Sequence, residues 1–383
     1  MTCELRERIA RVALGRLAEP GDPRLARLVA DLGATELYSH LRHDRDVAGV
    51  RTDVAARLDG LDPEAELERA DRQGLRFVCP GDPEWPRPVD DLDRAGMLNG
   101  RGGVPLGLWL KGTGRLDELC RRSVSVVGSR SATTYGATVA GEIAAHLAGE
   151  GVTLVSGAAF GIDQAAHRGA LAGRGPTVAV LACGVDRAYP VAHRDLLTYI
   201  AETGVVVSEL PPGCAPTKHR FLARNRIIAA LSLGTVVVEA AVRSGALNTS
   251  SWAALLNRTV MGVPGPVTSA PSEGVHELIR GSRAELVTRG SDVLELVSPV
   301  GSHTQAPPRA PQRPRDRLPA QEQQVLDAVP VTAPAATSSV ARAAGLAGPV
   351  VGAALRRLRT AGFVEEGEDG WRLSPAHRTG ASS

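Results

Sequence analysis

The feature that most constrains the fold of this chain is an alternation of short apolar runs and longer helical segments between residues 76 and 298. The runs are rich in β-branched residues and span 124–127, 153–155, 177–181, 205–208, 235–238 and 259–262. Strands that are buried on both faces are apolar throughout. The stretches of about 20 to 30 residues between the runs leave room for crossover helices. The pattern predicts an α/β fold with a doubly wound parallel sheet.

The rest of the chain divides into three further parts, so 383 residues are expected to form more than one domain. Residues 1–75 show apolar residues at helical spacing and predict a small helical domain. Residues 299–316 are rich in Pro and Arg and predict a linker. Residues 317–375 resume a folded pattern. The net charge of the chain is only +2, so any nucleic-acid site must be a local patch.

Cysteine usage and hydropathy indicate where the protein works. The five cysteines form no C-x-x-C pair, which favours a reducing compartment and argues against zinc. The histidines do not share ligand spacing, so we expect no metal site and no catalytic triad. The start of the chain is not typical of a signal peptide, and no run approaches transmembrane length. We therefore expect a cytoplasmic protein without membrane contact.

Polar, Gly-bearing loops follow three of the predicted strands. Because ligands of a parallel sheet bind at the carboxyl ends of its strands, these loops are the place to look for a site. A Gly-bearing turn that leads into a helix offers free N–H groups to a phosphate. A purely structural role in tight packing or helix capping stays open for each loop. The candidate contact residues here are Gly128, Ser129, Arg130, Gly157, Gly161, Ser244 and Gly245.

Residues 217–226 form a basic segment that carries four permanent positive charges and one aromatic ring. No Asp or Glu occurs between Glu209 and Glu239, so no neighbour in the sequence neutralises it. Cations for phosphates and a ring for a base are what a single-stranded nucleic acid needs. The alternative is a solvated helix start whose Phe is a core anchor. The candidate contact residues are Lys218, Phe221, Arg224, Asn225 and Arg226.

The basic segment and the three loops are expected at one edge of the sheet. The dinucleotide fingerprint G-x-G-x-x-G is absent. Together these features favour an extended groove for a polyanion over a pocket for one small molecule.

Several motifs, taken in order, resemble one known family. They are Val126-Val127-Gly128-Ser129-Arg130, Ser156-Gly157-Ala158-Ala159-Phe160-Gly161-Ile162-Asp163, Tyr189-Pro190, Ser208-Glu209-Leu210-Pro211-Pro212-Gly213, Phe221-x-x-Arg224-Asn225-Arg226-Ile227-Ile228-Ala229, Val238-Glu239-Ala240, Ser244-Gly245-Ala246-Leu247 and Val263-Pro264-Gly265. Their number and order resemble the DprA (Smf) family, the DNA-processing proteins of natural transformation.

The resemblance covers about residues 70–295 and implies an extended Rossmann-like fold for residues 76–298. It also implies a SAM-like domain at residues 1–75 and a winged helix at 317–375. Family members bind single-stranded DNA, dimerise through the Rossmann-like domain, and load RecA on incoming strands. The resemblance implies that Arg130, Lys218 and Phe221 contact the strand and that no cofactor is needed.

Two alternatives stay open at this point. The domain also looks related to LOG-type nucleotide phosphoribohydrolases, but their Pro-Gly-Gly-x-Gly-Thr-x-x-Glu motif is missing here. We therefore expect a binding protein and keep a nucleotide-processing enzyme as the runner-up. In the C-terminal module, Arg356, Arg357 and Arg359 suit a recognition helix. Four acidic residues between 365 and 369 would repel phosphates, so we favour protein contact or weak duplex contact there.

Overall fold

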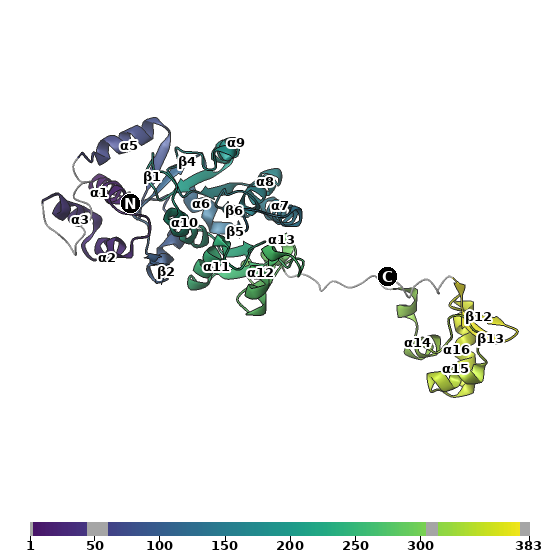
Figure 1. The fold of residues 1–383 in the computed structure, drawn as a ribbon. Helices are drawn as coiled ribbons and strands as arrows, with labels where there is room; N and C mark the ends of the chain where they lie inside the picture. The colour runs from purple at the N-terminus through teal and green to yellow at the C-terminus, as the bar shows by residue number, and fades with distance from the viewer. Residues whose placement is uncertain (1–2, 44–59, 304–312, 376–383) are drawn as a thin grey trace. The chain divides into compact units, whose positions relative to one another are not determined.

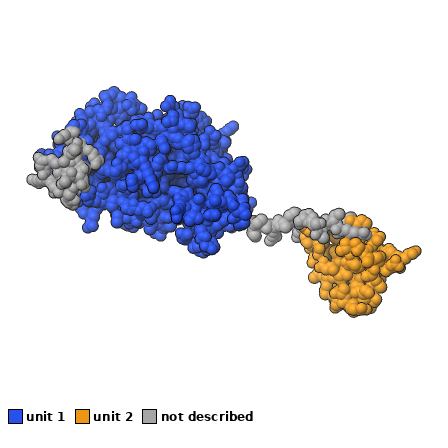
Figure 2. Space-filling view, viewed as in Figure 1, with its two compact units in different colours: residues 1–305 blue, residues 306–383 orange. Residues whose placement is uncertain are grey.

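A computed structural model describes residues 3–43, 60–303 and 313–375, and the chain divides into two compact units (Figure 1). The first unit spans residues 1–305 and the second spans 306–383 (Figure 2). The predicted linker lies partly outside the described residues, since 304–312 are not described. The end of the first unit falls within that predicted linker.

One large sheet organises the first unit. Its strands are β1 (Leu75–Val78), β4 (Leu108–Lys111), β5 (Ser123–Val127), β6 (Thr153–Ser156), β7 (Thr177–Val180), β8 (Val205–Ser208), β9 (Gly234–Val237), β10 (Thr259–Gly262) and β11 (Glu285–Leu286). Within the described residues their order is β1-β4-β8-β7-β6-β5-β9-β10-β11. Neighbours from β8 to β11 in this order are parallel, whereas β4 pairs antiparallel with β1 and β8. The predicted α/β class with a doubly wound sheet is confirmed.

Two features of the sheet were not predicted from the sequence. These are the antiparallel edge formed by β1 and β4, and the two-residue strand β11. The six predicted runs correspond to β5 through β10. A small antiparallel pair, β2 (Met97–Leu98) with β3 (Arg101–Gly102), lies outside the large sheet.

Helices cover both faces of the sheet. They are α6 (Leu116–Leu119), α7 (Thr134–Gly149), α8 (Ile162–Ala172), α9 (Arg194–Thr203), α10 (Lys218–Ala230), α11 (Gly245–Leu255), α12 (Ala270–Arg280) and α13 (Gly290–Val297), with the 3₁₀ helices η1 (Arg87–Asp93), η2 (Cys120–Arg122) and η3 (Val191–His193). Buried residues of α10, α11 and α12 share one core, whereas those of α7, α8 and α13 share another. The alternation of side chains along a strand explains the two cores. Val205 and Val207 of β8 point into the α10 core, and Val206 points into a third cluster that includes residues of α9.

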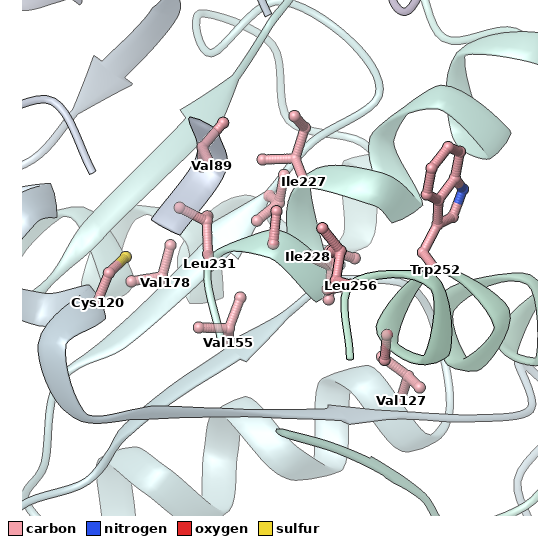
Figure 3. Close-up of a cluster of buried hydrophobic side chains, with 14 of the residues drawn as sticks. Val89, Cys120, Val127, Val155, Val178, Ile227, Ile228, Leu231, Trp252 and Leu256 are labelled. Carbon is pink, nitrogen blue, oxygen red and sulfur yellow. The ribbon is translucent and has the colours of Figure 1, made fainter. Parts of the chain in front are cut away.

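The core beneath α10 fixes the position of that helix. Ile227, Ile228 and Leu231 pack against strand residues such as Val178, beside Trp252 of α11 (Figure 3). Each of these five side chains is almost completely buried. Burying a large aliphatic side chain contributes about 1.5–3 kcal/mol. The apolar carboxyl half of α10 therefore anchors its basic amino half at the edge of the sheet.

The N-terminal helices pack on the same unit. They are α1 (Leu5–Leu17), α2 (Pro23–Leu32), α3 (Ala34–Arg42) and α5 (Pro63–Arg72). Val12 of α1 shares a core with Phe77 and Trp109 of the antiparallel edge. The predicted boundary at residue 75 thus separates two parts of one compact unit. The SAM-like assignment stays a prediction, and residues 44–59 of that region lie outside the described residues.

The second unit has its own core and a different architecture. Its elements are η4 (Pro314–Arg317), α14 (Ala320–Asp327), α15 (Thr337–Ala344), α16 (Gly348–Thr360), β12 (Val364–Gly367) and β13 (Gly370–Leu373). The turn after α15 is made by Gly345 at a φ of 65°, a left-handed conformation that suits glycine. The order of helices and hairpin is that expected for a winged helix, an assignment that stays a prediction.

Among the described residues, no single helix is long and apolar enough to span a membrane, and α15 and α16 pass that test only as a pair bent by 105°.

Candidate nucleic-acid interface

A cleft of about 780 Å³ opens at the carboxyl ends of the central strands. The strand order reverses there, because β5 lies between β6 and β9. Ligands of open α/β sheets bind at such a switch point. The cleft is lined by the loops after β5, β6 and β9 and by the amino ends of α10 and α11. The sequence prediction that these segments share one sheet edge agrees with this geometry.

The loop after β5 is held in place by a buried carboxylate. Glu239, two residues after the end of β9, accepts hydrogen bonds from the backbone N–H of Thr133 at 3.0 Å and from its hydroxyl. The backbone carbonyl of Glu239 also accepts from the N–H of Ser129 at 2.7 Å. These bonds place the exposed side chain of Arg130 at the mouth of the cleft. Glu239 is thus a positioning residue for the Gly128-Ser129-Arg130 loop.

The amino end of α10 supplies a cation and a ring to the same cleft. Thr217 caps the helix, since its hydroxyl accepts from the N–H of Arg220 at 3.3 Å. Lys218 is exposed and lines the cleft. Phe221 is half-buried, and the guanidinium carbon of Arg130 lies 4.6 Å from the centre of its ring. The ring of Tyr189 lies 5.7 Å from that of Phe221, between ring centres.

The buried guanidinium of Arg224 lies beneath this ring, 5.7 Å from its centre. The guanidinium of Arg224 donates to the carbonyls of Gly157 and Val180, each at 2.6 Å. Burial lowers the pKa of Arg224 to about 10, an effect that nearby Asp163 opposes and Arg130 enhances. Arg224 therefore stays charged at neutral pH. Burial raises the pKa of Asp163, and the charge of Arg224 opposes that rise.

The burial of Gly157 and Arg226 corrects two of the predicted contacts. Gly157 is buried, and a Cβ there would come within 2.1 Å of the Arg224 guanidinium, so this glycine serves packing. Arg226 is fully buried and donates to Glu209 at 2.6 Å and to the carbonyl of Gly103 at 3.2 Å. Neither residue lines the cleft. We therefore leave both out of the proposed contact surface.

The expectation that nothing neutralises the basic segment is also wrong. Glu19, from the turn after α1, pairs with Arg220 at 2.7 Å, and Glu209 pairs with Arg226. Glu19 is distant in the sequence, and Glu209 lies at the amino end of the acid-free stretch. Lys218 makes no ion pair within the described part of the chain. Residues 217–226 therefore present fewer free positive charges to the cleft than the four counted in the sequence.

The amino end of α11 completes the opposite wall. Ser244 caps this helix by accepting from the N–H of Ala246 at 3.3 Å, and Gly245 is exposed. Asn225 of α10 donates to the carbonyl of Gly245 at 3.3 Å, which ties the two helices together. Arg243 is exposed and lines the cleft, although sequence reasoning did not single it out. Its position directly before the third Gly-bearing turn is the sequence feature that could have identified it as a lining residue.

The remaining predicted residues, Gly128, Ser129 and Gly161, lie at or beside the cleft. Gly128 and Ser129 line it. Gly161 has a φ of 77°, and a Cβ there would meet the carbonyl oxygen of Ser129 at 2.3 Å. Only glycine fits that position without strain. Its role is therefore to let the turn after β6 pack against the turn after β5.

The chemistry of the lining is cationic and aromatic rather than metal-binding. Arg130, Lys218, Arg224 and Arg243 contribute positive charge, and Asp163 is the one acidic residue among the described lining residues. The described residues contain no group of three or more His, Cys, Asp or Glu that could hold a metal ion. Such a lining suits a phosphate chain and a stacked base.

Comparison with known proteins agrees with this fold. The family model for DNA recombination-mediator protein A matches residues 76–298. The chain is 43% identical over 362 residues to a DNA processing protein DprA of Mycobacterium tuberculosis. The matched region covers 94% of this chain and 92% of the relative. It is also 44% identical over 191 residues to DprA of Streptococcus pneumoniae, and this match covers 50% of this chain and 66% of the relative. The X-ray structure of the S. pneumoniae protein matches with a TM-score of 0.63 at 31% identity, covering 78% of this chain and 99% of that chain.

Fold and site together define a Rossmann-like α/β protein with a basic, aromatic cleft at the switch point of its sheet. The chain belongs to the DprA (Smf) family of DNA-processing proteins, which confirms the resemblance seen in its motifs.

Proposed function

We propose that this protein binds single-stranded DNA in the switch-point cleft. The observation that carries the proposal is the ring of Phe221, which lies 4.6 Å from the Arg130 guanidinium and 5.7 Å from the Tyr189 ring and shares its cleft with the exposed Lys218. A base that stacks on an aromatic face contributes about 1–3 kcal/mol and needs no particular sequence. The cations Arg130 and Lys218, which line the same cleft, supply the contacts to phosphates.

The half-burial of Phe221 favours single strands over duplexes. In a duplex the faces of the bases are stacked on one another, so a ring inside a cleft cannot reach them. An unpaired base can turn into the cleft and cover the ring. We therefore propose discrimination by access to a base face rather than by sequence.

We further propose that the protein acts as a cytoplasmic homodimer that helps load RecA on the bound strand, in transformation or recombination. Family membership supports this role. Leu286 is 53% exposed and belongs to the edge strand β11. Exposed apolar groups beside an unpaired strand edge are suited to contact with a second chain.

We propose binding rather than nucleotide turnover for the cleft. Asp163, the acidic residue among its described lining residues, is only 6% exposed and faces the charge of Arg224. A general base must reach the proton that it abstracts, and this carboxyl lies beneath the cleft surface. Release of base or phosphate from nucleotides by the purified protein would contradict this view.

The test is the binding of labelled oligothymidine by fluorescence anisotropy across a salt series, with a duplex of equal length for comparison. The variant Arg130→Ala/Lys218→Ala should weaken single-strand binding and make the log–log salt slope shallower by about 1.4, two contacts at about 0.7 each. The control variant Arg121→Ala/Arg280→Ala also removes two exposed positive charges. These residues precede β5 and β11, so they lie toward the amino ends of the strands and not at the carboxyl ends where the cleft opens. An unchanged slope in the first variant, or equal losses in both, would contradict the proposal.

A further inference from the structure

A second cleft lies beside the first one, on the other side of the loop formed by residues 185–191. It has a volume of about 480 Å³ and lies between the end of β4, this loop and the first turns of α9. Its buried apolar lining residues are Leu181, Val185, Leu197 and Val206. Lys111, Arg187 and Arg194 also line it, and their side chains are exposed. The second cleft is therefore an apolar groove edged by three cations.

The cations of the second cleft are available for a ligand. Arg187 donates to the carbonyl of Gly213 at 3.1 Å, and within the described residues Lys111, Arg187 and Arg194 form no ion pair with Asp or Glu. Asp186 is the acidic residue of the lining, and its carboxylate accepts from the N–H of Gly213 at 2.9 Å. The charged lining residues therefore sum to a net positive charge.

The two clefts share a wall. Tyr189 lines the first cleft, whereas its neighbours Ala188 and Val191 line the second. The loop of residues 185–191 therefore contributes to both clefts. Each cleft also holds one of the two lysines in a chain whose 44 basic side chains are otherwise all arginine, Lys218 in the first and Lys111 in the second.

We infer that the second cleft binds the continuation of the same DNA strand, so that the strand passes over Tyr189 from Phe221 toward Lys111. The inference rests on the proposed function of the first cleft. Continuity with that cleft and net positive charge both fit a phosphate chain, and the apolar lining suits the faces of bases. An acidic protein segment is the other polyanion that this groove could take, and the experiment separates the two.

The experiment compares two labelled oligothymidines, of about 4 and about 16 nucleotides, which span the range of site sizes for single-strand modules. The variant Lys111→Ala/Arg194→Ala should bind the long strand with a salt slope shallower by about 1.4. Its affinity for the short strand should match that of the unaltered protein. The control variant Arg121→Ala/Arg280→Ala should behave as the unaltered protein on both strands, and melting temperatures confirm that each variant is folded.

Each outcome decides the matter. If Lys111→Ala/Arg194→Ala binds the long strand with unchanged slope while Arg130→Ala/Lys218→Ala is weakened, the second cleft does not hold DNA and an acidic protein segment becomes its better occupant. If the unaltered protein binds neither strand, the proposed function of the first cleft fails and this inference fails with it. Equal loss on both strand lengths would also overturn it, because the short strand is expected to occupy the first cleft alone.

Discussion

The two sides of α10 carry similar residues and use them differently. On the side of the cleft, Lys218, Phe221 and Asn225 follow each other at spacings of three and four residues and so share one face of the helix. On the side of the N-terminal helices, Arg220 and Arg226 point to carboxylates. One side offers its groups to a ligand, whereas the other uses its charges to hold the protein together.

The difference shows that the charge of a segment in the sequence is not the charge that a ligand meets. Arg220 is held by Glu19 and by the carbonyl of Ala215 at 2.6 Å, and Arg226 is held by Glu209. The two ion pairs join α10 to the N-terminal helices and to the strand end of β8. The cleft side is thereby presented on a rigid helix, which limits the entropy that binding must remove.

The largest expected effect is on folding rather than on DNA. Replacing Arg226→Ala leaves the carboxylate of Glu209 without its buried partner, and breaking a buried pair in this way costs about 3–5 kcal/mol. Urea denaturation should show a lower free energy of unfolding. The double variant Arg226→Ala/Glu209→Ala should lose less than the sum of the two single variants. If the Arg226→Ala protein has normal stability and binds DNA weakly, Arg226 contacts the strand from the cleft side and the account is contradicted.

The next effect is on affinity and belongs to the cleft side. Phe221→Ala should weaken binding of single strands by about 1–3 kcal/mol, roughly ten- to a hundredfold, because a stacked base loses its platform. The salt slope should not change, and Phe221→Tyr should be nearly neutral. Affinity and melting temperature are measured on the same preparation. A destabilised Phe221→Ala protein whose folded fraction binds normally would make the ring a core anchor instead.

The smallest effect is expected at Glu19. The side chain of Glu19 is 43% exposed, so Glu19→Gln weakens a partly solvated pair and should lower the free energy of unfolding by about 0.2–1 kcal/mol. Binding of oligothymidine should stay unchanged, because Arg220 keeps its bond to the carbonyl of Ala215. A clear rise in affinity would show that Arg220, once released, reaches the strand.

The sequence predicted the sheet and much of the cleft because both depend on local pattern. Short apolar runs identified the central strands, and the rule that ligands bind at strand ends brought Arg130, Lys218 and Phe221 to one edge. The antiparallel edge strand β1 could not be predicted in this way, because its sequence, Leu-Arg-Phe-Val, contains a charged residue and one β-branched residue and so is not an apolar β-branched run.

The features of the site that the sequence did not predict are contacts between residues far apart in the chain. Glu19 and Arg220 are separated by 201 positions, so no local search for acids could find the pair. Tyr189 is not among the contact residues predicted from the sequence, but the fold places its ring 5.7 Å from that of Phe221. Arg226 shares the basic segment with Lys218, and only contacts with distant segments, among them Gly21 and Gly103, decide that it is buried.

The most direct test of the two sides of α10 compares Lys218→Ala with Arg220→Ala on one oligothymidine across a salt series. Both variants remove one positive charge from the first turn of the same helix. The account predicts that Lys218→Ala makes the log–log salt slope shallower by about 0.7, the value for one phosphate contact, and that Arg220→Ala leaves it unchanged. Equal changes in both variants, or a change in Arg220→Ala alone, would contradict it.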